Sequence, residues 1–286
     1  MTTGDEAAVS RLAPAKINLT LHVTGQRADG YHLLDSLVVF AELGDVVGLR
    51  PGVGLTLDIT GPQAPALAPE PDNLVLRAAR LIGARDAALS LDKRLPVASG
   101  MGGGSSDAAA ALHLLATRNS VPVPDTASAM RLGADLPVCL VAPQPSRMQG
   151  LGERVSGVGS VPALWLLLVN PGQGLATPAV FKALTEKHKA PMPDRLPSWH
   201  DAADLSAWLA TQRNDLEPPA RCLMPPISDV LTALAEQPGC LLARMTGSGA
   251  TCFGIFSDHA SLQAGAAALH RPGRFVAATR SFASVS

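Results

Sequence analysis

One glycine-rich stretch, Leu95 to Leu112, constrains the fold of this chain more than any other part of it. The stretch reads LPVASGMGGGSSDAAAAL and runs into an alanine-rich helix. Its glycines are Gly100, Gly102, Gly103 and Gly104. Glycine allows positive φ and brings backbone amides close to a ligand, and the first amides of a helix have no partner inside the helix. The pattern therefore favours a phosphate site over a flexible loop that Ser105 or Ser106 merely caps.

The loop differs from the two best-known phosphate-binding motifs. A Walker loop has a lysine after its last glycine, and here that position is Ser105. The sequence also contains no G-x-G-x-x-G, so it does not indicate a Rossmann dinucleotide site. A cation that assists this loop must therefore come from another part of the chain.

The bulk composition narrows the class of protein. The 286 residues, 47% of them hydrophobic, suffice for one large or two medium domains. A formal net charge of -1 gives no reason to expect a nucleic-acid or membrane partner, and no obligate protein partner is evident. The longest apolar run, near 161–169, is far shorter than the roughly 20 residues of a membrane helix. The first 16 residues lack the apolar core of a signal peptide.

The four cysteines are widely spaced, and no C-x-x-C occurs. They are Cys139, Cys222, Cys240 and Cys252. This usage predicts small buried side chains in a reducing cytoplasm, without a metal site or a disulfide framework. We therefore expect a cytoplasmic protein with no protein-bound metal cluster.

Three further positions carry side chains that suit chemistry. Alternation from Ala15 to Thr24 predicts a half-buried strand with Lys16 and Asn18 on its polar face, where a solvated lysine is the usual outcome. Tyr31 and His32 follow the turn GQRADG and could hold a planar ligand, although a tyrosine at the edge of the core fits equally well.

The third position, Asp135, lies in LGADLPVCLV, ahead of what we expect to be a buried apolar strand. The local pattern favours a cap or turn residue over a functional acid.

The remaining pattern predicts a mixed α+β fold with the glycine loop between a strand and a helix. Before the loop we expect strands over 34–40, 45–50, 53–60 and 88–95 and a helix capped by Asp72. After the loop we expect one helix that ends at about 118, a second helix over 126–132, and then an apolar strand over 161–169. The rest of the chain is predicted to alternate helices and strands, with the helices on one face of the sheet. The helices are expected from about 178, over 227–236 and over 261–270, and the strands over 241–246, 252–256 and 274–279.

Three blocks of this sequence resemble the superfamily of galactokinase, homoserine kinase, mevalonate kinase and phosphomevalonate kinase (GHMP kinases). They are PAKINLTLHVTGQRADGYHLLDSL, the glycine stretch itself, and RMTGSGATCFGIF from Arg244 to Phe256. K-I-N followed by G-Q-R-x-D-G-Y-H is most similar to the branch that phosphorylates 4-diphosphocytidyl-2-C-methyl-D-erythritol. The resemblance spans nearly the whole chain.

The resemblance implies a two-domain GHMP-kinase-like fold with the active site in the inter-domain cleft. Residues 1–160 would form the ATP-binding domain and residues 161–286 an α+β sandwich domain. The reaction implied is transfer of the γ-phosphoryl group of ATP, with Mg²⁺, to the 2-hydroxyl group of the cytidyl substrate. That reaction is a step in the non-mevalonate pathway to isoprenoid precursors.

The resemblance also assigns roles to residues. Lys16 and Asp135 match the active-site lysine and the catalytic aspartate. The residues that would hold the ATP phosphates are Gly100, Gly102, Gly103, Gly104, Ser105 and Ser106. The residues on the substrate side are Asn18, Tyr31, His32, Phe181, Gly247, Ser248 and Gly249. Tyr31, His32 and Phe181 would hold the cytosine ring, while Asp107 would complement the helix dipole or reach Mg²⁺.

Two other functions fit parts of the pattern. A GHMP kinase for homoserine or mevalonate would share the loop, but its substrate has no nucleobase for Tyr31 and His32. A non-catalytic nucleotide-binding or RNA-binding module would need neither Lys16 nor Asp135, and the chain is poor in aromatic residues, at 3%.

Overall fold

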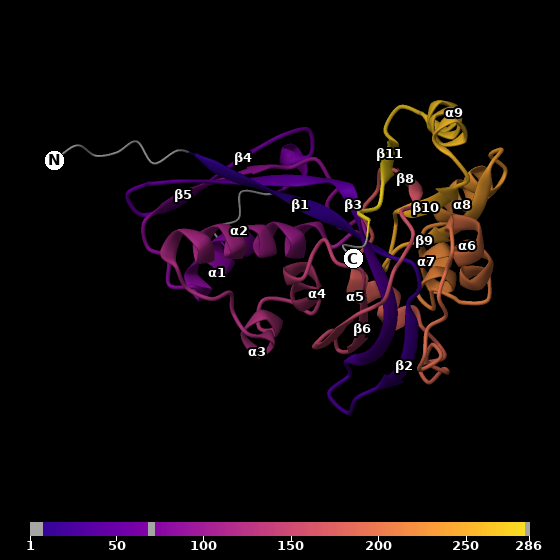
Figure 1. Cartoon of the computed structure of the whole chain (residues 1–286), viewed down its shortest axis with the longest axis horizontal. Helices are drawn as coiled ribbons and strands as arrows, with labels where there is room; N and C mark the ends of the chain where they lie inside the picture. The colour runs from indigo at the N-terminus through magenta and orange to yellow at the C-terminus, as the bar shows by residue number, and fades with distance from the viewer. Residues whose placement is uncertain (1–7, 68–71, 284–286) are drawn as a thin grey trace.

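Two β-sheets with their helices make up the part of the chain that the structure, a computed structural model, describes: residues 8–67 and 72–283 (Figure 1). The first sheet has seven strands, in the order β4-β5-β3-β6-β7, and β1 and β2 also pair with β3. These strands are β1 (Val9–Asn18), β2 (His22–Gln26), β3 (His32–Arg50), β4 (Leu55–Thr60), β5 (Ala87–Asp92), β6 (Ser146–Gly150) and β7 (Arg154–Gly157). Only β4 and β5 run parallel to each other in this sheet.

The long strand β3 organises the first sheet, because β1, β2, β5 and β6 all pair with it. We predicted two strands here, over 34–40 and 45–50, and the structure has one strand of 19 residues. The strand continues through Gly44, which lies between the two predicted segments. A Cβ at this position would collide with the backbone of Ala13 and Pro14 on β1. Glycine therefore allows β1 and β3 to approach closely at that point.

Four helices accompany the first sheet. They are α1 (Leu74–Leu81), α2 (Gly103–Asn119), α3 (Thr126–Met130) and α4 (Leu136–Leu140), and a short 3₁₀ turn spans Ala64–Ala66. The alanine-rich middle of α2 is buried, because it packs on β1, β3 and α1. The small side chains allow this close packing, which fixes the start of α2 relative to the sheet.

The second sheet has four antiparallel strands in the order β11-β8-β10-β9. They are β8 (Trp165–Asn170), β9 (Cys240–Met245), β10 (Cys252–Phe256) and β11 (Phe275–Arg280), and the helices of this half are α5 (Thr177–Ala183), α6 (Ala202–Ala210), α7 (Glu217–Leu223), α8 (Pro226–Ala235) and α9 (His259–Leu269). Alternate residues of β8 and β10 point to opposite sides, so both faces are apolar.

One face of the second sheet packs on α8 and α9, and the other meets the first sheet. Ile17, Leu37 and Val39 of the first sheet share an apolar cluster with Leu168 and Phe253 of the second. The prediction of helices on a single face was therefore incomplete, because α6 contributes Leu205 and Leu209 to this shared cluster. In Figure 1 the two halves meet along this shared layer.

Burial from Ala13 to Val23 corrects the prediction of a half-buried strand. The segment divides into β1 and β2, and both of its faces are covered. Lys16 and Asn18 are 3% and 0% exposed, so the expectation of a solvated lysine was wrong. Periodicity detected the apolar face, whereas the covering of the polar face comes from distant parts of the chain.

Several elements differ from the sequence-based expectations. The segment after Asp135 is the helix α4 and not a strand, and Pro137 in its first turn is the local feature that suits a helix start. The cap of α1 is Asn73, which accepts from the amide of Val75, and not Asp72. Helices α6 and α7 and strands β6 and β7 were not predicted.

One prediction falls partly outside the described residues, namely the N-terminal segment judged not to be a signal peptide. Among the cysteines, Cys139 and Cys252 are buried as predicted, whereas Cys240 is partly exposed and Cys222 is exposed. Within 8–67 and 72–283, no helix has the length and apolar character needed to cross a bilayer.

Candidate active site

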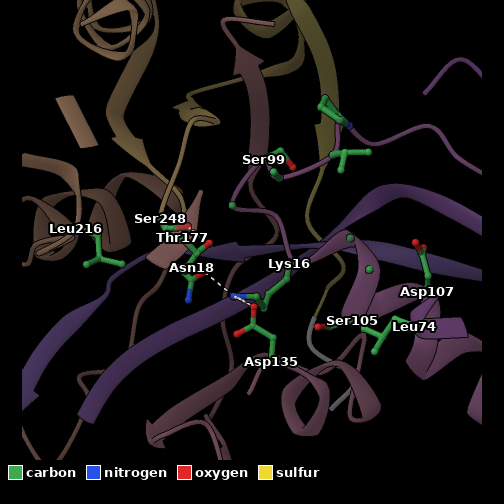
Figure 2. A pocket seen from close by; sticks show the side chains of 18 of the residues that line it. Lys16, Asn18, Leu74, Ser99, Ser105, Asp107, Asp135, Thr177, Leu216 and Ser248 are labelled. Atoms are coloured by element: carbon green, nitrogen blue, oxygen red, sulfur yellow. Dashed lines mark hydrogen bonds and ion pairs between the residues drawn. The ribbon is translucent and has the colours of Figure 1, made fainter. Parts of the chain in front are cut away.

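A cavity of about 430 Å³ lies at the glycine loop, and residues of both halves line it (Figure 2). The predicted site residues that line it are Lys16, Asn18, Gly100, Gly102, Gly103, Gly104, Ser105, Asp135, Phe181, Gly247 and Ser248. The structure thus brings together eleven of the fifteen predicted positions. The other four are Tyr31, His32, Ser106 and Gly249, which lie outside the lining.

The glycine loop ends where α2 begins, and the first three residues of α2 line the cavity. Gly102 occupies the N-cap position in the left-handed conformation, with φ of 63°, and no side chain caps the helix start. The disfavoured alternative, in which Ser105 or Ser106 merely caps the helix, is therefore excluded as regards a side-chain hydrogen bond. The amides of Gly103, Gly104 and Ser105 have no partner within the helix because of their position in its first turn. This arrangement suits an anion.

The second glycine-rich turn, Gly247 to Ala250, supports the loop from behind. A Cβ on Gly100 would lie 2.5 Å from the carbonyl oxygen of Thr246, and a Cβ on Gly247 would collide with the carbonyl of Gly100. The amide of Thr251 donates to the carbonyl of Ser99 at 3.1 Å. Each turn therefore needs glycine in order to pack against the other, which joins the loop of the first half to a turn of the second.

Lys16 approaches the loop from β1 and is fixed at both its backbone and its side chain. Its amide donates to the carbonyl of Met101 at 2.9 Å. A Cβ on Gly102 would lie 2.8 Å from Cε of Lys16, so glycine at 102 makes room for this side chain. Nζ of Lys16 donates to Oδ1 of Asn18 at 2.8 Å and lies 3.3 Å from Oδ2 of Asp135. The loop therefore obtains its cation from a strand about eighty-five residues upstream.

Asn18 holds the other side of the lysine. Its Nδ2 donates to Oγ of Ser36 at 2.8 Å, and its own amide donates to Oγ1 of Thr246 at 2.9 Å. The side-chain amide of Asn18 thus accepts from Lys16 through Oδ1 and donates to Ser36 through Nδ2. These two hydrogen bonds fix its orientation beside Lys16. Figure 2 shows Lys16 between Asn18 and Asp135.

Asp135 is the most open member of this group. It occupies the N-cap position of α4, but in the structure its side chain accepts no capping hydrogen bond from that helix. The carboxylate lines the cavity, is 36% exposed, and is held by Lys16. Asp135 therefore stands at the cap position of α4, but the prediction that its side chain caps the helix was wrong. The carboxylate is available to a bound molecule.

The three predicted nucleobase contacts lie near one another, but in an unexpected arrangement. His32 stacks on Phe181, with ring centroids 4.8 Å apart and an interplanar angle of 23°. Tyr31 is 65% exposed. Burial and the neighbouring Lys187 lower the pKa of His32, so its ring stays neutral at physiological pH. His32 thus covers one face of the Phe181 ring, and a base seated on that same face would have to replace the imidazole.

Two predicted residues have structural tasks instead of facing the cavity. Oγ of Ser106 donates to the carbonyl of Pro14 at 2.8 Å, and its amide donates to the carbonyl of Gly102. Ser106 thus joins α2 to β1 and has no free donor for a phosphate, which corrects its assignment to the phosphate cradle. Gly249 turns away from the cavity, since a Cβ there would meet Met245 and Ile227.

A buried ion cluster under the loop, which consists of Asp45, Lys93 and Asp107, was not predicted from the sequence. Nζ of Lys93 contacts Oδ2 of Asp45 and lies 2.8 Å from Oδ2 of Asp107. All three side chains are almost fully buried. The Asp107 position was noted as a possible dipole or Mg²⁺ contact, but it lies in the second turn of α2, where the dipole effect has faded.

Two hydroxyl groups at the mouth of the cavity were also only partly anticipated. Oγ1 of Thr177 and Oγ of Ser248 lie 2.7 Å apart, and both residues line the cavity. Ser248 was predicted to lie on the substrate side, whereas Thr177 was not. The chemistry of the whole arrangement is an anion cradle, a lysine–carboxylate pair and an uncharged polar and aromatic mouth.

The sequence matches two family descriptions of known proteins. The family description "GHMP kinases N terminal domain" matches residues 73–142, and "GHMP kinases C terminal" matches residues 183–274. Together they cover more than half of the chain. A relative from Cereibacter sphaeroides named 4-diphosphocytidyl-2-C-methyl-D-erythritol kinase is 58% identical, over 94% of this chain and 97% of its own length.

Solved structures agree with the family matches. A crystal structure of 4-(cytidine 5'-diphospho)-2C-methyl-D-erythritol kinase has a TM-score of 0.75 and 31% identity, covering 96% of this chain and all of its own. Mevalonate kinase of L. major, in complex with R-mevalonate, has a TM-score of 0.68 with 15% identity, covering 100% of this chain and 99% of its own. The second likeness establishes a common fold.

Proposed function

Because the chain belongs to the GHMP kinase family and is therefore a small-molecule kinase, we propose that it phosphorylates the 2-hydroxyl group of 4-diphosphocytidyl-2-C-methyl-D-erythritol with ATP. The observation that supports this most directly is the shared cavity, in which an anion-binding loop and the Lys16–Asp135 pair face the same space. The reaction is a step in the non-mevalonate pathway to isoprenoid precursors.

The loop would hold the donor. Phosphoryl transfer has a loose transition state, so an enzyme accelerates it mainly by positioning the groups and neutralising the oxygens. The free amides of Gly103, Gly104 and Ser105 would bind the β- and γ-phosphates, and their fixed geometry comes from the contact between Gly100 and Gly247. The cavity residues Leu67, Asn73 and Leu74 remain for the nucleoside.

The Lys16–Asp135 pair would act on the acceptor. The Asp135 carboxylate would accept the proton of the attacking hydroxyl group. Lys16, 3.3 Å from that carboxylate and held by Asn18, would counter negative charge on the transferring phosphoryl group. Both roles need a side chain that reaches the cavity, and both residues line it.

A magnesium ion fits this site as a companion of the nucleotide. The described residues contain no group of three acidic, histidine or cysteine side chains that could cage a metal. Mg²⁺ is commonly held by one or two carboxylates, substrate phosphates and water. Asp135 is the partly exposed carboxylate lining the cavity, so it is the side chain that would face the ion. When bound, the ion would neutralise phosphate charge.

The acceptor half would read the cytidyl group. His32, Phe181 and Tyr31 supply the rings beside the cavity, and Thr177 and Ser248 supply hydroxyl groups at its mouth. Pyrimidine rings stack well on aromatic side chains. This set of contacts would discriminate a nucleotide-linked alcohol from homoserine or mevalonate.

The organisation around this activity is also a proposal. We propose an ATP-binding domain over 1–160 and a second domain over 161–286, with the reaction at their junction. The chain would work in the cytoplasm, where ATP is plentiful, without an obligate protein partner.

A coupled assay of ADP release tests the proposal. The protein is incubated with MgATP and, in parallel, with 4-diphosphocytidyl-2-C-methyl-D-erythritol, homoserine or mevalonate. We expect ADP release only with the cytidyl substrate, and mass spectrometry should show one added phosphate. Turnover with homoserine or mevalonate alone would contradict the proposed acceptor.

A further inference from the structure

The ion cluster beneath the phosphate loop has an unusual charge balance. Lys93 follows β5, Asp45 lies on β3 and Asp107 lies on α2, so two carboxylates share one ammonium group. Lys93 is 3% exposed, Asp45 0% and Asp107 2%. Burying charge is costly unless each charge is paired and hydrogen-bonded. A cluster with both carboxylates ionised would carry a net charge of about −1 in a nearly dry site.

The two carboxylates are not equivalent. Oδ1 of Asp45 accepts from the amides of Arg94 at 2.6 Å and of Leu95 at 2.8 Å, and its Oδ2 contacts Lys93. Asp45 is thus saturated with donors, which favours its ionised form. Oδ2 of Asp107 accepts from Lys93, but its Oδ1 is buried and has no partner among the described residues. An unpartnered buried carboxylate oxygen favours a proton at that atom.

Among the described residues, the charges that act on the pKa of Asp107 come from two side chains only. The charged groups that face it are Lys93 and Asp45, and Asp45 raises its proton affinity. Cys139 on α4 also interacts with Asp107, and burial keeps its thiol neutral by raising its pKa to about 12. Burial is likewise the main cause that raises the pKa of Asp107, to about 8. The carboxyl group therefore changes its protonation state slightly above neutral pH.

The cluster also touches the phosphate site itself. Lys93 and Asp107 line the cavity, and a Cβ on Gly103 would lie 3.0 Å from Nζ of Lys93. Figure 2 shows Asp107 beside the start of α2, on the side away from Lys16 and Asp135. Negative charge on a nucleotide at the Gly103 amide would oppose a second negative charge directly below it.

From this geometry we propose that nucleotide binding at the loop is coupled to the uptake of one proton by Asp107. The proton comes from solvent and adds to the carboxylate of Asp107, at the oxygen that has no partner. With Asp107 neutral, Asp45 and Lys93 balance each other and the loop has an uncharged underside. With Asp107 ionised, the underside is anionic and repels the phosphates. This inference rests on the proposed function, because it requires the nucleotide to bind at this loop.

Titration calorimetry with ADP measures the coupling directly. Binding is followed between about pH 6 and pH 9, each time in two buffers of different ionisation enthalpy, which yields the number of protons taken up. Beyond the titration of the nucleotide itself, we expect the wild-type protein to take up almost no proton near pH 6 and a substantial fraction of one proton near pH 8.5. The dissociation constant should rise above pH 8 by at most about tenfold per pH unit, because one proton is linked.

Two variants complete the test. Asp107→Asn imitates the neutral carboxyl group, so its ADP affinity should stay flat with pH, and its proton uptake should equal the titration of the nucleotide alone. Asp92→Asn is the matched control, because it removes a partly exposed carboxylate one residue from Lys93 that pairs with Arg94 instead. It should keep the wild-type pH profile.

The outcomes separate the inference from the function it rests on. ADP binding by the wild type without proton uptake near pH 8.5 would overturn the inference and leave the proposed function intact. Identical pH profiles for wild type and Asp107→Asn would also overturn it. If ADP did not bind to the wild type at any pH, the proposed function and this inference would both fail. The wild-type measurement stands alone if the Asp107→Asn chain does not fold.

Discussion

Two lysine–aspartate groups flank the same glycine loop, and they differ in one respect that separates their tasks. Lys16 and Asp135 lie 3.3 Å apart with the carboxylate 36% exposed to the cavity. Lys93 lies between Asp45 and Asp107 with all three side chains buried. A partly exposed pair can exchange a proton with a bound molecule, whereas a buried cluster can only position or repel one. The open pair therefore suits chemistry and the closed cluster suits support of the loop.

Removal of the cation from the open pair should have a large effect on catalysis. Lys16→Met removes the positive charge that faces the transferring phosphoryl group, so kcat should fall by about 10²–10³. Thermal unfolding should show that the variant is folded, and steady-state ADP release gives kcat. Arg154→Met, at an exposed strand end, serves as the control and should match wild type. A Lys16→Met enzyme with near-normal kcat would remove the open pair from the chemistry.

Removal of the cation from the closed cluster should act on stability. Lys93→Met leaves Asp45 and Asp107 buried without their counter-charge, which should cost about 3–5 kcal/mol in the free energy of unfolding. Urea unfolding followed by circular dichroism measures the change. Arg94→Met is the control, because that side chain is 48% exposed and surface pairs are worth at most about 1 kcal/mol. Equal losses for both variants would mean that the cluster is not a special support.

A third substitution, at Tyr31, should change substrate binding without affecting either lysine–aspartate group. Tyr31→Ala removes a 65% exposed ring that we assign to the nucleobase. Base stacking is worth about 1–3 kcal/mol, so the KM for the cytidyl substrate should rise by about 5- to 150-fold while the KM for ATP stays constant. Tyr31→Phe keeps the ring and should stay close to wild type. If both KM values rose together, Tyr31 would be a structural residue.

A further expected effect is a dependence of the free energy of unfolding on pH that belongs to the closed cluster. The pKa of Asp107 is raised by burial from 3.8 to about 8. Between these values the folded chain binds a proton that the unfolded chain does not, so the contribution of Asp107 to stability falls as pH rises. The Tm of Asp107→Asn minus that of wild type should therefore increase from pH 5 to pH 8. A difference that is constant across this range would show that Asp107 does not titrate there.

The sequence predicted the parts of the site whose requirements are local. The glycine loop was identifiable because positive φ and free helix amides depend on neighbouring residues, and α2 ends at Asn119, close to the predicted end. The strands of the second sheet were also placed within a few residues. Resemblance to a family was needed to connect Lys16 and Asp135 with the loop, since no local pattern links positions so far apart.

The parts that the sequence did not predict depend on tertiary packing. The pairing of Lys93 with Asp107 exists because α2 docks beside the end of β5, and nothing in the spacing of these residues indicates it. The burial of Lys16 comes from covering elements of both halves. Ser106 looked like a phosphate contact, yet its hydroxyl group joins α2 to Pro14 on β1. In each case a polar side chain took its role from a distant neighbour.

The rate of a single phosphoryl transfer in Asp135→Asn, measured by rapid quench at saturating nucleotide and acceptor, tests the division between the two groups most directly. We predict that this rate falls by about 10²–10⁴, as expected for loss of a positioned general base, while the dissociation constant for ADP stays within about twofold of wild type. A rate near the wild-type value, or a loss of ADP affinity in proportion to the loss of rate, would contradict the account.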